Sequence, residues 1–299
     1  MTIISPRSLA FVVLALEACG ARENATVEPA ADARSISGFS APESALYDAR
    51  ADQYFVSNIN GDAFAADHNG FISRVSPDGT ITALRFIDGA SDGLSAPKGM
   101  ALVGRELYVA DIDRVRVYDA DSGAVLGVVE VAGASFLNDL DAAPDGTVYV
   151  TDTGIRSDGA QGMAPTGNDG IYALKKGTGA KRIAGGDLGR PNGIVWNDGK
   201  LEVVTLGSGE WLTVSLSGRI EHRTKLPQGM LDGLVKLDPD DFLASSWDAP
   251  AVYRLRAGAP AKVVFSSKSP ADIAYDSRRQ RLLVPVLLED RLVFASLPR

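Results

Sequence analysis

The stretch RPNGIVWNDGKLEVVTLGSG (residues 190–209) consists of a Pro-Asn-Gly turn, a short apolar run, a polar turn and a second apolar run. Two apolar runs joined by a polar turn are typical of a β-hairpin. The same pattern recurs in five other stretches: APESALYDARADQYFVSN (41–58), APKGMALVGRELYVAD (96–111), FLNDLDAAPDGTVYVTD (136–152), MLDGLVKLDPDDFLASS (230–246) and SPADIAYDSRRQRLLVP (269–285). Self-similarity of this kind indicates a repeat architecture. The sequence therefore predicts six copies of one β unit.

Further alternating runs lie between the copies, as in FISRVSPDGTITALRF (71–86) and RVRVYDADSGAVLGVV (114–129). They bring each unit to four strands, and no helical periodicity is visible after residue 35. This pattern predicts an all-β fold, a six-bladed β-propeller over residues 34–299. The last copy offers only three strands, while residues 33–39 (ARSISGF) are left without a partner. We expect this N-terminal strand to complete the last blade and close the ring, which removes two exposed sheet edges.

Composition and charge exclude several classes of function. The 299 residues include 30 basic and 38 acidic side chains, a net charge of −8, which argues against a nucleic-acid partner. The only cysteine is Cys19, so the propeller region can form neither an intrachain disulfide nor a thiol nucleophile. The sequence contains no Gly-x-Ser-x-Gly elbow, phosphate-binding loop, zinc spacing or dinucleotide fingerprint.

The N-terminus has the pattern of an export signal. Residues 1–19 contain one positive charge, Arg7, an apolar stretch over residues 9–16, and small residues around a cleavage point. The end of this segment, Leu-Glu-Ala-Cys at 16–19, resembles a bacterial lipobox, in which the cysteine is lipidated. Plain secretion and a chance resemblance are the alternatives. Residues 20–33 are expected to form a polar tether. The expected location is outside the cytoplasm of a bacterium, in the periplasm or anchored to a membrane through Cys19.

Aligning the six copies on their opening turns reveals a set of equivalent positions. The residues equivalent to Asn192 are Glu43, Lys98, Asn138, Asn192, Asp232 and Ala271. The innermost strand of each blade lines the channel of a propeller, so these side chains should converge on its axis. Small or apolar residues would fill that position at a lower desolvation cost. The polar residues of this ring therefore indicate a functional site.

Most of the ring residues are oxygen donors, which hard divalent cations prefer. Ca²⁺ takes about six to eight oxygen ligands, with waters completing the shell. Two carboxylates, Glu43 and Asp232, would balance its charge. The alternative is a hydrogen-bonded plug in which Lys98 pairs with Glu43 or Asp232. The sequence favours the metal site because the oxygen donors fall at matching repeat positions.

These residues resemble those of a known family. The Pro-Glu of blade one (42–43), LNDLDAAPDGTVYVTDTG (137–154), RPNGIVW (190–196) and LDGL (231–234) are similar to motifs of the gluconolactonase, regucalcin and luciferin-regenerating-enzyme group of six-bladed propellers. The resemblance covers residues 35–299. It implies that Glu43, Asn138, Asn192 and Asp232 bind a divalent cation, usually Ca²⁺.

The resemblance also implies a chemistry. The hydrolases of this family use the metal as a Lewis acid on a lactone or phosphoryl oxygen, and Asp232 would be the general base or nucleophile. The sequence departs from the family at three places. Lys98 either clamps an anionic substrate or weakens metal binding by repulsion, Ala271 leaves blade six without a polar ring residue, and Ser44-Ala45 replaces the family's Gly-Pro after Glu43.

Loops after each second strand should share one face of the ring with these residues. Their polar candidates are Asn58, Asn60, Asp62, Asp111, Asp113, Asp152, Arg156, Ser208, Glu210 and Trp247, and the longest loop, 152–169, is either a lid or an ordinary solvated loop. Asp139 and Asp272 replace the glycine of other copies and are expected mainly to fix turn backbones. His68 is a weak candidate for a general base, and His222 is expected on an outer surface strand. Packing between blades explains all three tryptophans.

Two functions are consistent with this sequence. The first is a Ca²⁺-dependent hydrolase of lactones or related esters, acting on a small molecule outside the cytoplasm, with Asp232 and Lys98 as candidate catalytic residues. The second is a non-catalytic propeller lipoprotein, a binding or scaffold module whose axial site is structural. The retained Asp232 favours the first function, whereas Lys98 and the Ser44-Ala45 departure favour the second.

Overall fold

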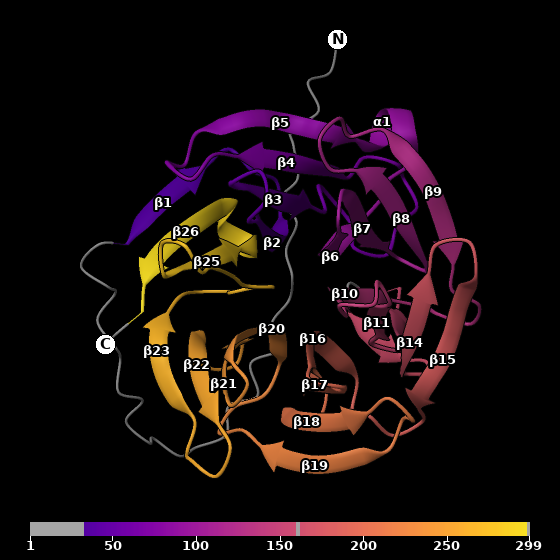
Figure 1. Ribbon diagram of the computed structural model, residues 1–299, viewed down its shortest axis with the longest axis vertical. Helices are drawn as coiled ribbons and strands as arrows, with labels where there is room; N and C mark the ends of the chain where they lie inside the picture. Colours follow the sequence, from indigo (N-terminus) through magenta and orange to yellow (C-terminus); the bar gives the residue numbers. More distant parts are fainter. Residues whose placement is uncertain (1–32, 160–161, 298–299) are drawn as a thin grey trace.

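The computed structural model describes residues 33–159 and 162–297. Six four-stranded antiparallel sheets surround a common centre, with β2, β6, β10, β16 and β20 nearest the centre and β1, β5, β9, β15, β19 and β23 at the rim (Figure 1). The predicted all-β, six-bladed propeller is confirmed. The predicted signal segment, Cys19 and residues 20–32 of the tether lie outside the described residues.

The strands follow the repeats along the chain. Blade 1 contains β2 (Pro42–Asp48), β3 (Gln53–Asn58), β4 (Phe71–Val75) and β5 (Ile81–Asp88). Blade 2 contains β6 (Pro97–Val103), β7 (Glu106–Asp111), β8 (Arg114–Asp119) and β9 (Val125–Glu130). Blade 3 contains β10 (Leu137–Ala142), β11 (Val148–Asp152), β14 (Gly170–Lys175) and β15 (Gly179–Gly185).

The second half of the ring repeats the same order. Blade 4 contains β16 (Pro191–Asn197), β17 (Lys200–Thr205), β18 (Glu210–Ser215) and β19 (Ile220–Lys225). Blade 5 contains β20 (Leu231–Asp238), β21 (Asp241–Ser246), β22 (Ala251–Arg256) and β23 (Lys262–Ser266). Blade 6 contains β24 (Ala274–Asp276), β25 (Arg281–Val286), β26 (Arg291–Ser296) and β1 (Arg34–Ser37).

Four short elements lie outside the blades. The loop after β11 contains a hairpin of β12 (Ile155–Ser157) and β13 (Met163–Pro165). The short helix α1 (Gly89–Asp92) follows β5, and the 3-10 turn η1 (Leu287–Glu289) follows β25. Among the described residues, no helix is both long and apolar enough to cross a membrane.

Blade 6 is closed by the N-terminal strand, as predicted. β1 pairs antiparallel with β26, so that Ile36 lies opposite Leu292. Ile36 is buried in the cluster that also holds Leu292 and Phe294. The blade that ends the chain is therefore completed by a strand from its beginning, and this pairing removes the exposed edge of β26.

The core is divided among the interfaces between neighbouring blades. Each of six hydrophobic clusters combines side chains of two adjacent blades. The cluster between blades 1 and 2, for example, packs Phe55 and Ile72 against Leu107 and Val109. A seventh cluster collects apolar loop residues from all six blades at one end of the channel. The six interface clusters hold the ring, and the seventh forms the mouth of a cavity.

A β-bulge in each inner strand aims the ring residue at the axis. In blade 1, Pro42 lies opposite Asn58 and Ala45 opposite Val56, so the inner strand has one residue more than its partner. The same irregularity occurs in β6, β10, β16 and β20. A bulge leaves its extra residue outside the ladder and redirects a side chain. In each of these five strands, the bulge falls at the ring position and the residue after it.

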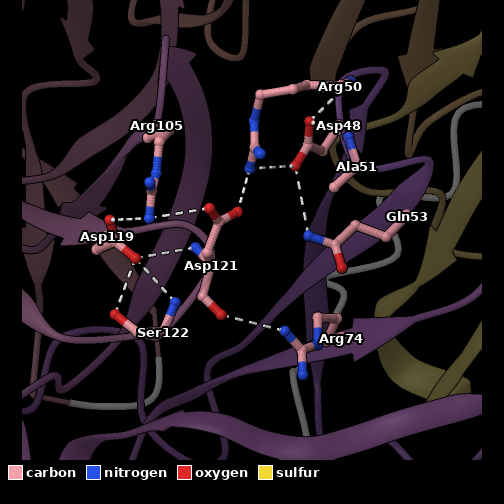
Figure 2. A network of polar contacts seen from close by, with 9 residues as sticks. All are labelled: Asp48, Arg50, Ala51, Gln53, Arg74, Arg105, Asp119, Asp121 and Ser122. Carbon is pink, nitrogen blue, oxygen red and sulfur yellow. Dashed lines mark hydrogen bonds and ion pairs between the residues drawn. The ribbon is translucent and has the colours of Figure 1, made fainter.

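The opposite end of the propeller is linked by ion pairs. Arg50, in the turn after β2, contacts Asp48 and also reaches Asp121 in blade 2 (Figure 2). Arg105 binds the same Asp121 at 3.0 Å and Asp119 at 3.2 Å. These contacts connect the turns of blades 1 and 2 on the face away from the cavity.

Candidate active site

A cavity of about 370 Å³ lies on the propeller axis, at the end bordered by the seventh cluster. Its polar floor contains Glu43, Lys98, Asn138, Asn192 and Asp232, each no more than 5% exposed. The structure therefore brings together all five polar residues that the repeat alignment placed on the axis. The sixth ring residue, Ala271, is fully buried in the mouth cluster and adds no polar atom.

Asp232 is held at both carboxylate oxygens. Asn192 donates to Oδ1 at 3.1 Å, and the indole nitrogen of Trp247 donates to Oδ2 at 2.7 Å. Packing between blades is therefore an incomplete explanation of Trp247, because its indole N–H is part of the site. Burial raises the pKa of Asp232 to about 6, and the two hydrogen bonds oppose this shift.

Two other oxygens of the floor have no hydrogen-bond partner in the described part of the chain. Glu43 Oε2 and Asn192 Oδ1 are buried and unpaired. Asn192 uses its amide nitrogen on Asp232 and on the carbonyl of Leu231, which leaves its oxygen free. Asn138 likewise donates its nitrogen to Thr153 Oγ1 at 3.0 Å. A buried acceptor without a donor costs free energy unless a ligand completes it.

Lys98 is buried without an ion pair. Its Nζ donates to the carbonyl of Ala96 at 3.0 Å and lies 4.1 Å from the ring centroid of Phe136. Within the described residues, no carboxylate lies within 4.0 Å of it, so the predicted alternative of a direct pair with Glu43 or Asp232 is not formed. Burial lowers the pKa of Lys98 to about 8, while Glu43 and Asp111 oppose the shift through space.

The carboxylates of the floor destabilise one another. Burial raises the pKa of Glu43 well above its usual range, and the neighbouring Asp232 and Asp272 raise it further. Lys98 lowers it only in part. Counting two carboxylates and one ammonium, the ionised ring carries a charge of −2 + 1 = −1. A bound cation would relieve this repulsion and favour the ionised carboxylates.

A second layer of buried carboxyl groups lies next to the ring. Asp139 accepts from the backbone N–H of Ile194 in blade 4 at 2.8 Å, and Asp272 accepts from Ser44 Oγ in blade 1 at 2.5 Å. Both carboxyl groups therefore connect neighbouring blades, which extends the predicted backbone role. Ser44, a departure from the resembled motif, has a structural use as the partner of Asp272.

The donor set of the floor fits a hard divalent cation. Two carboxylates and two carboxamides supply oxygen ligands, and two of their oxygens have no hydrogen-bond partner within residues 33–159 and 162–297. In the part of the chain that is described, no three His, Cys, Asp or Glu side chains come together as a metal site. The ring has only two such residues, so the fit depends on the oxygens of Asn138 and Asn192.

Most of the polar loop candidates lie outside the cavity, and several of them accept hydrogen bonds from backbone N–H groups. Asp111 and Asp152, at the ends of β7 and β11, accept from the N–H groups of Ala96 and Phe136, both at 2.9 Å. Asn58 similarly accepts from Ser40 at 3.0 Å. Asn60, Asp62, Asp113, Arg156, Ser208 and Glu210 do not line the cavity either, whereas Trp247 does.

The cavity wall consists of residues that the search for polar groups passed over. Ile59, Phe64, Leu206 and Leu287 come from the predicted loops, and the long loop adds Ile155 and Met163 through its hairpin. Alternation could not have revealed them, because they lie outside the blade strands or at their ends. His68 is exposed and does not line the cavity, and His222 lies on the outer strand β19, as predicted.

Comparison with known proteins matches the fold but not the sequence. No protein-family model and no curated protein matches the sequence. A gluconolactonase from Xanthomonas campestris superposes with a TM-score of 0.65 at 21% identity, covering 90% of this chain and 91% of that one. The chain has the gluconolactonase fold. A second gluconolactonase-assigned structure gives a TM-score of 0.64 at 18% identity, covering 90% and 93%.

This gluconolactonase-like propeller also resembles enzymes of another class. A streptogramin B lyase superposes with a TM-score of 0.62 at 12% identity, covering 89% of this chain and 97% of that one. One fold thus carries hydrolytic and lyase chemistry, and fold alone does not assign an activity. The function of this gluconolactonase-like chain must be argued from the residues of its cavity.

Proposed function

We propose that the axial cavity is the active site of a Ca²⁺-dependent hydrolase of lactones or related esters. The observation that carries this proposal is the floor itself, where two buried oxygens without a partner among the described residues lie in the same ring as a carboxylate fixed by two donors. Lys98 adds a buried ammonium beside them. The gluconolactonase neighbour supports the choice of a lactone as the substrate class.

Glu43, Asn138, Asn192 and Asp232 would hold the cation. When bound, the ion would act as a Lewis acid that polarises the substrate carbonyl. Two negative charges on the ligands balance a divalent ion, and the amide oxygens add neutral donors. Another hard divalent cation would satisfy the same donors.

The residues of the chain handle the protons and the negative charge. Asp232, fixed by Trp247 and Asn192, takes a proton from the attacking water as its oxygen bonds to the carbonyl carbon. The carbon–oxygen bond to the leaving alkoxide then breaks, and the proton passes to that alkoxide. The product of a lactone is the open hydroxy acid. Lys98 stabilises the oxyanion formed on the way.

The second candidate is a binding propeller without catalysis, in which the axial site is structural. It is favoured by one observation, the unpaired charge of Lys98 in the same ring that would hold the cation. Under either function we propose an exported protein, attached to a membrane through lipidated Cys19. That location rests on the N-terminal sequence pattern alone.

Hydrolysis of a panel of lactones and aryl esters, with Ca²⁺ and with EDTA, tests the hydrolase. We expect turnover in Ca²⁺ that EDTA abolishes. Unfolding followed in parallel should show a higher melting temperature with Ca²⁺, because a ligand that binds only the folded state stabilises it. Glu43→Gln should lose both effects. A protein that binds no ion and shows no shift in melting temperature would contradict the metal site and favour the binding propeller.

A further inference from the structure

The cavity is divided into a polar floor and an apolar wall. Above the ring residues, the lining side chains are almost all hydrophobic: Ile59, Ala63, Phe64, Phe136, Ile155, Met163, Leu206, Met230 and Leu287. The remaining wall residues are Trp247, whose N–H is directed to Asp232, and the exposed Asp248. The wall therefore offers a substrate very few hydrogen-bonding groups.

Polar loop residues of the same end make hydrogen bonds within their own loops. Asn60 donates to the carbonyl of Asn69 at 2.8 Å, and Asp62 accepts from the backbone N–H of Phe64 at 2.9 Å. Ser208 donates to the carboxylate of Glu210 at 2.7 Å. These groups fix the loops that carry the apolar side chains. None of Asn60, Asp62 and Ser208 lines the cavity, so they offer no hydrogen bond to a substrate enclosed in it.

Desolvation then decides which substrates fit. A hydroxyl group moved from water to such a wall without a partner costs about 1–3 kcal/mol, and a sugar lactone carries several hydroxyls. An apolar chain gains about 0.8 kcal/mol for each buried methylene group. The volume of about 370 Å³ is at the small end of ligand cavities, so only a short chain or one ring can be enclosed.

We propose that the cavity selects lactones or esters that carry an apolar chain or ring, and discriminates against polyhydroxylated lactones. The reacting carbonyl lies at the floor, near Asp232 and Lys98, and the apolar substituent contacts the wall. The reaction in this proposal rests on the proposed hydrolase function, whereas the class of ligand is inferred from the cavity wall alone. The specificity-determining residues are Leu206 in blade 4, Leu287 in blade 6 and Met163 in the hairpin. Their apolar side chains line the wall and are not part of the polar ring.

A matched pair of six-membered lactones tests the selectivity. δ-Decalactone and glucono-δ-lactone share the reacting ring but carry an apolar chain and hydroxyl groups, respectively. With Ca²⁺ and after subtraction of spontaneous hydrolysis, we expect kcat/KM to be at least about 100-fold higher for δ-decalactone. Equal values, or a preference for glucono-δ-lactone, would overturn the proposal while leaving the hydrolase function intact.

Substitutions in the wall should change this ratio. Leu206→Asn keeps the number and branching of the side-chain heavy atoms but adds a polar group, and should lower kcat/KM for δ-decalactone about 10-fold with little change for the unsubstituted δ-valerolactone. Met163→Gln, at a side chain that is 40% exposed, gives a second variant that is less demanding for folding. Leu216→Asn is the matched control, since Leu216 is 41% exposed and lies away from the cavity. Unchanged selectivity in both wall variants would contradict the assignment.

A binding measurement separates the ligand class from the catalysis. The full chain is titrated in a calorimeter with 2-pentylcyclohexanone and, separately, with glucose. Neither compound contains an ester bond, so neither can be hydrolysed during the measurement. We expect the ketone to bind, Leu206→Asn to weaken it and glucose to give no signal. Ketone binding without cleavage of any lactone would retain the apolar ligand class and overturn the hydrolase. Failure of the ketone to bind, or binding of glucose, would overturn the ligand class.

Discussion

The two ends of the propeller use charged residues in opposite ways. At the end shown in Figure 2, Arg50 and Arg105 share Asp121, and every charged side chain drawn has a partner. At the cavity end, Lys98 has no ion pair among the described residues, and Glu43 Oε2 has no hydrogen bond. The pairs that Asp121 forms with Arg50 and Arg105 are partly exposed, whereas Lys98 and Glu43 are buried.

This difference indicates which end is functional. Partly exposed ion pairs change the free energy of folding little in either direction. The linkage of neighbouring turns is therefore a sufficient explanation for them. Buried charges without partners reduce stability, and such groups cluster at sites that bind or react. The unpaired state of the floor is therefore a stronger indication of function than its polarity alone.

Asp232→Asn should have the largest effect, on activity. Loss of the proton acceptor should lower kcat by about 10²–10⁴-fold, because general-base catalysis contributes on that order. Asn retains the volume and one acceptor oxygen, so the fold should persist. The measurement is steady-state hydrolysis of a lactone that the unmodified protein cleaves. Asp240→Asn, at an exposed carboxylate that does not line the cavity, is the control and should retain activity. Equal losses in both variants would contradict the role of Asp232.

Tyr54→Phe should have the largest effect on stability at the ion-paired end. The buried Tyr54 of blade 1 donates to Asp276 Oδ2 of blade 6 at 2.5 Å. Removing a donor from a buried carboxylate should lower the free energy of unfolding by about 1–3 kcal/mol. Chemical denaturation measures this loss, and lactone hydrolysis in native buffer should not change. A loss of activity without a loss of stability would show that the two ends are coupled.

Lys98→Met should affect the cation more than the fold. It removes a like charge from the ring and leaves the Phe136 contact apolar, so Ca²⁺ affinity should rise about tenfold. The same variant should lower kcat, because the ammonium no longer stabilises the oxyanion. Calorimetric titration with Ca²⁺ gives the affinity, and Lys176→Met, at an exposed lysine paired with Glu106, is the matched control. Weaker Ca²⁺ binding in Lys98→Met would show that the lysine supports the ion site.

Asp121→Asn should have the smallest effect. Although Asp121 joins Arg50 and Arg105, its side chain is 37% exposed and solvent screens these pairs. We expect the melting temperature to change by no more than about 1 °C in moderate salt. Differential scanning calorimetry at low and high salt checks this. A large drop would mean that the network of Figure 2 holds blades 1 and 2 together.

The fold was predictable because each blade is a local unit. Turn residues and alternating runs specify a four-stranded sheet within about fifty residues, and six such repeats leave a propeller as the arrangement that buries every sheet face. The closing strand β1 could be inferred because one strand was missing at one end of the chain and one was spare at the other. The five polar ring residues followed from the same alignment.

The roles of individual side chains in the site were not predictable. From the sequence, Trp247 could serve either packing between blades or the site. The structure decides this, because its indole nitrogen lies 2.7 Å from Asp232 Oδ2. The sequence allowed Lys98 to pair with Glu43 or Asp232, but its nitrogen contacts the Ala96 carbonyl and the Phe136 ring. Such choices depend on rotamers and on a few tenths of an ångström, which residue type and spacing do not specify.

The sequence by itself determined the six repeats, the closing strand and the residue types on the axis, because strand periodicity and turn chemistry are local properties. Only the tertiary structure decided that the cavity has an apolar wall above a charged floor. Its wall residues come from the loops of different blades, and ring closure brings them together. Among the described residues, the buried oxygens Glu43 Oε2 and Asn192 Oδ1 likewise have no hydrogen-bond partner, and this depends on ring closure because the neighbouring ring side chains belong to other blades.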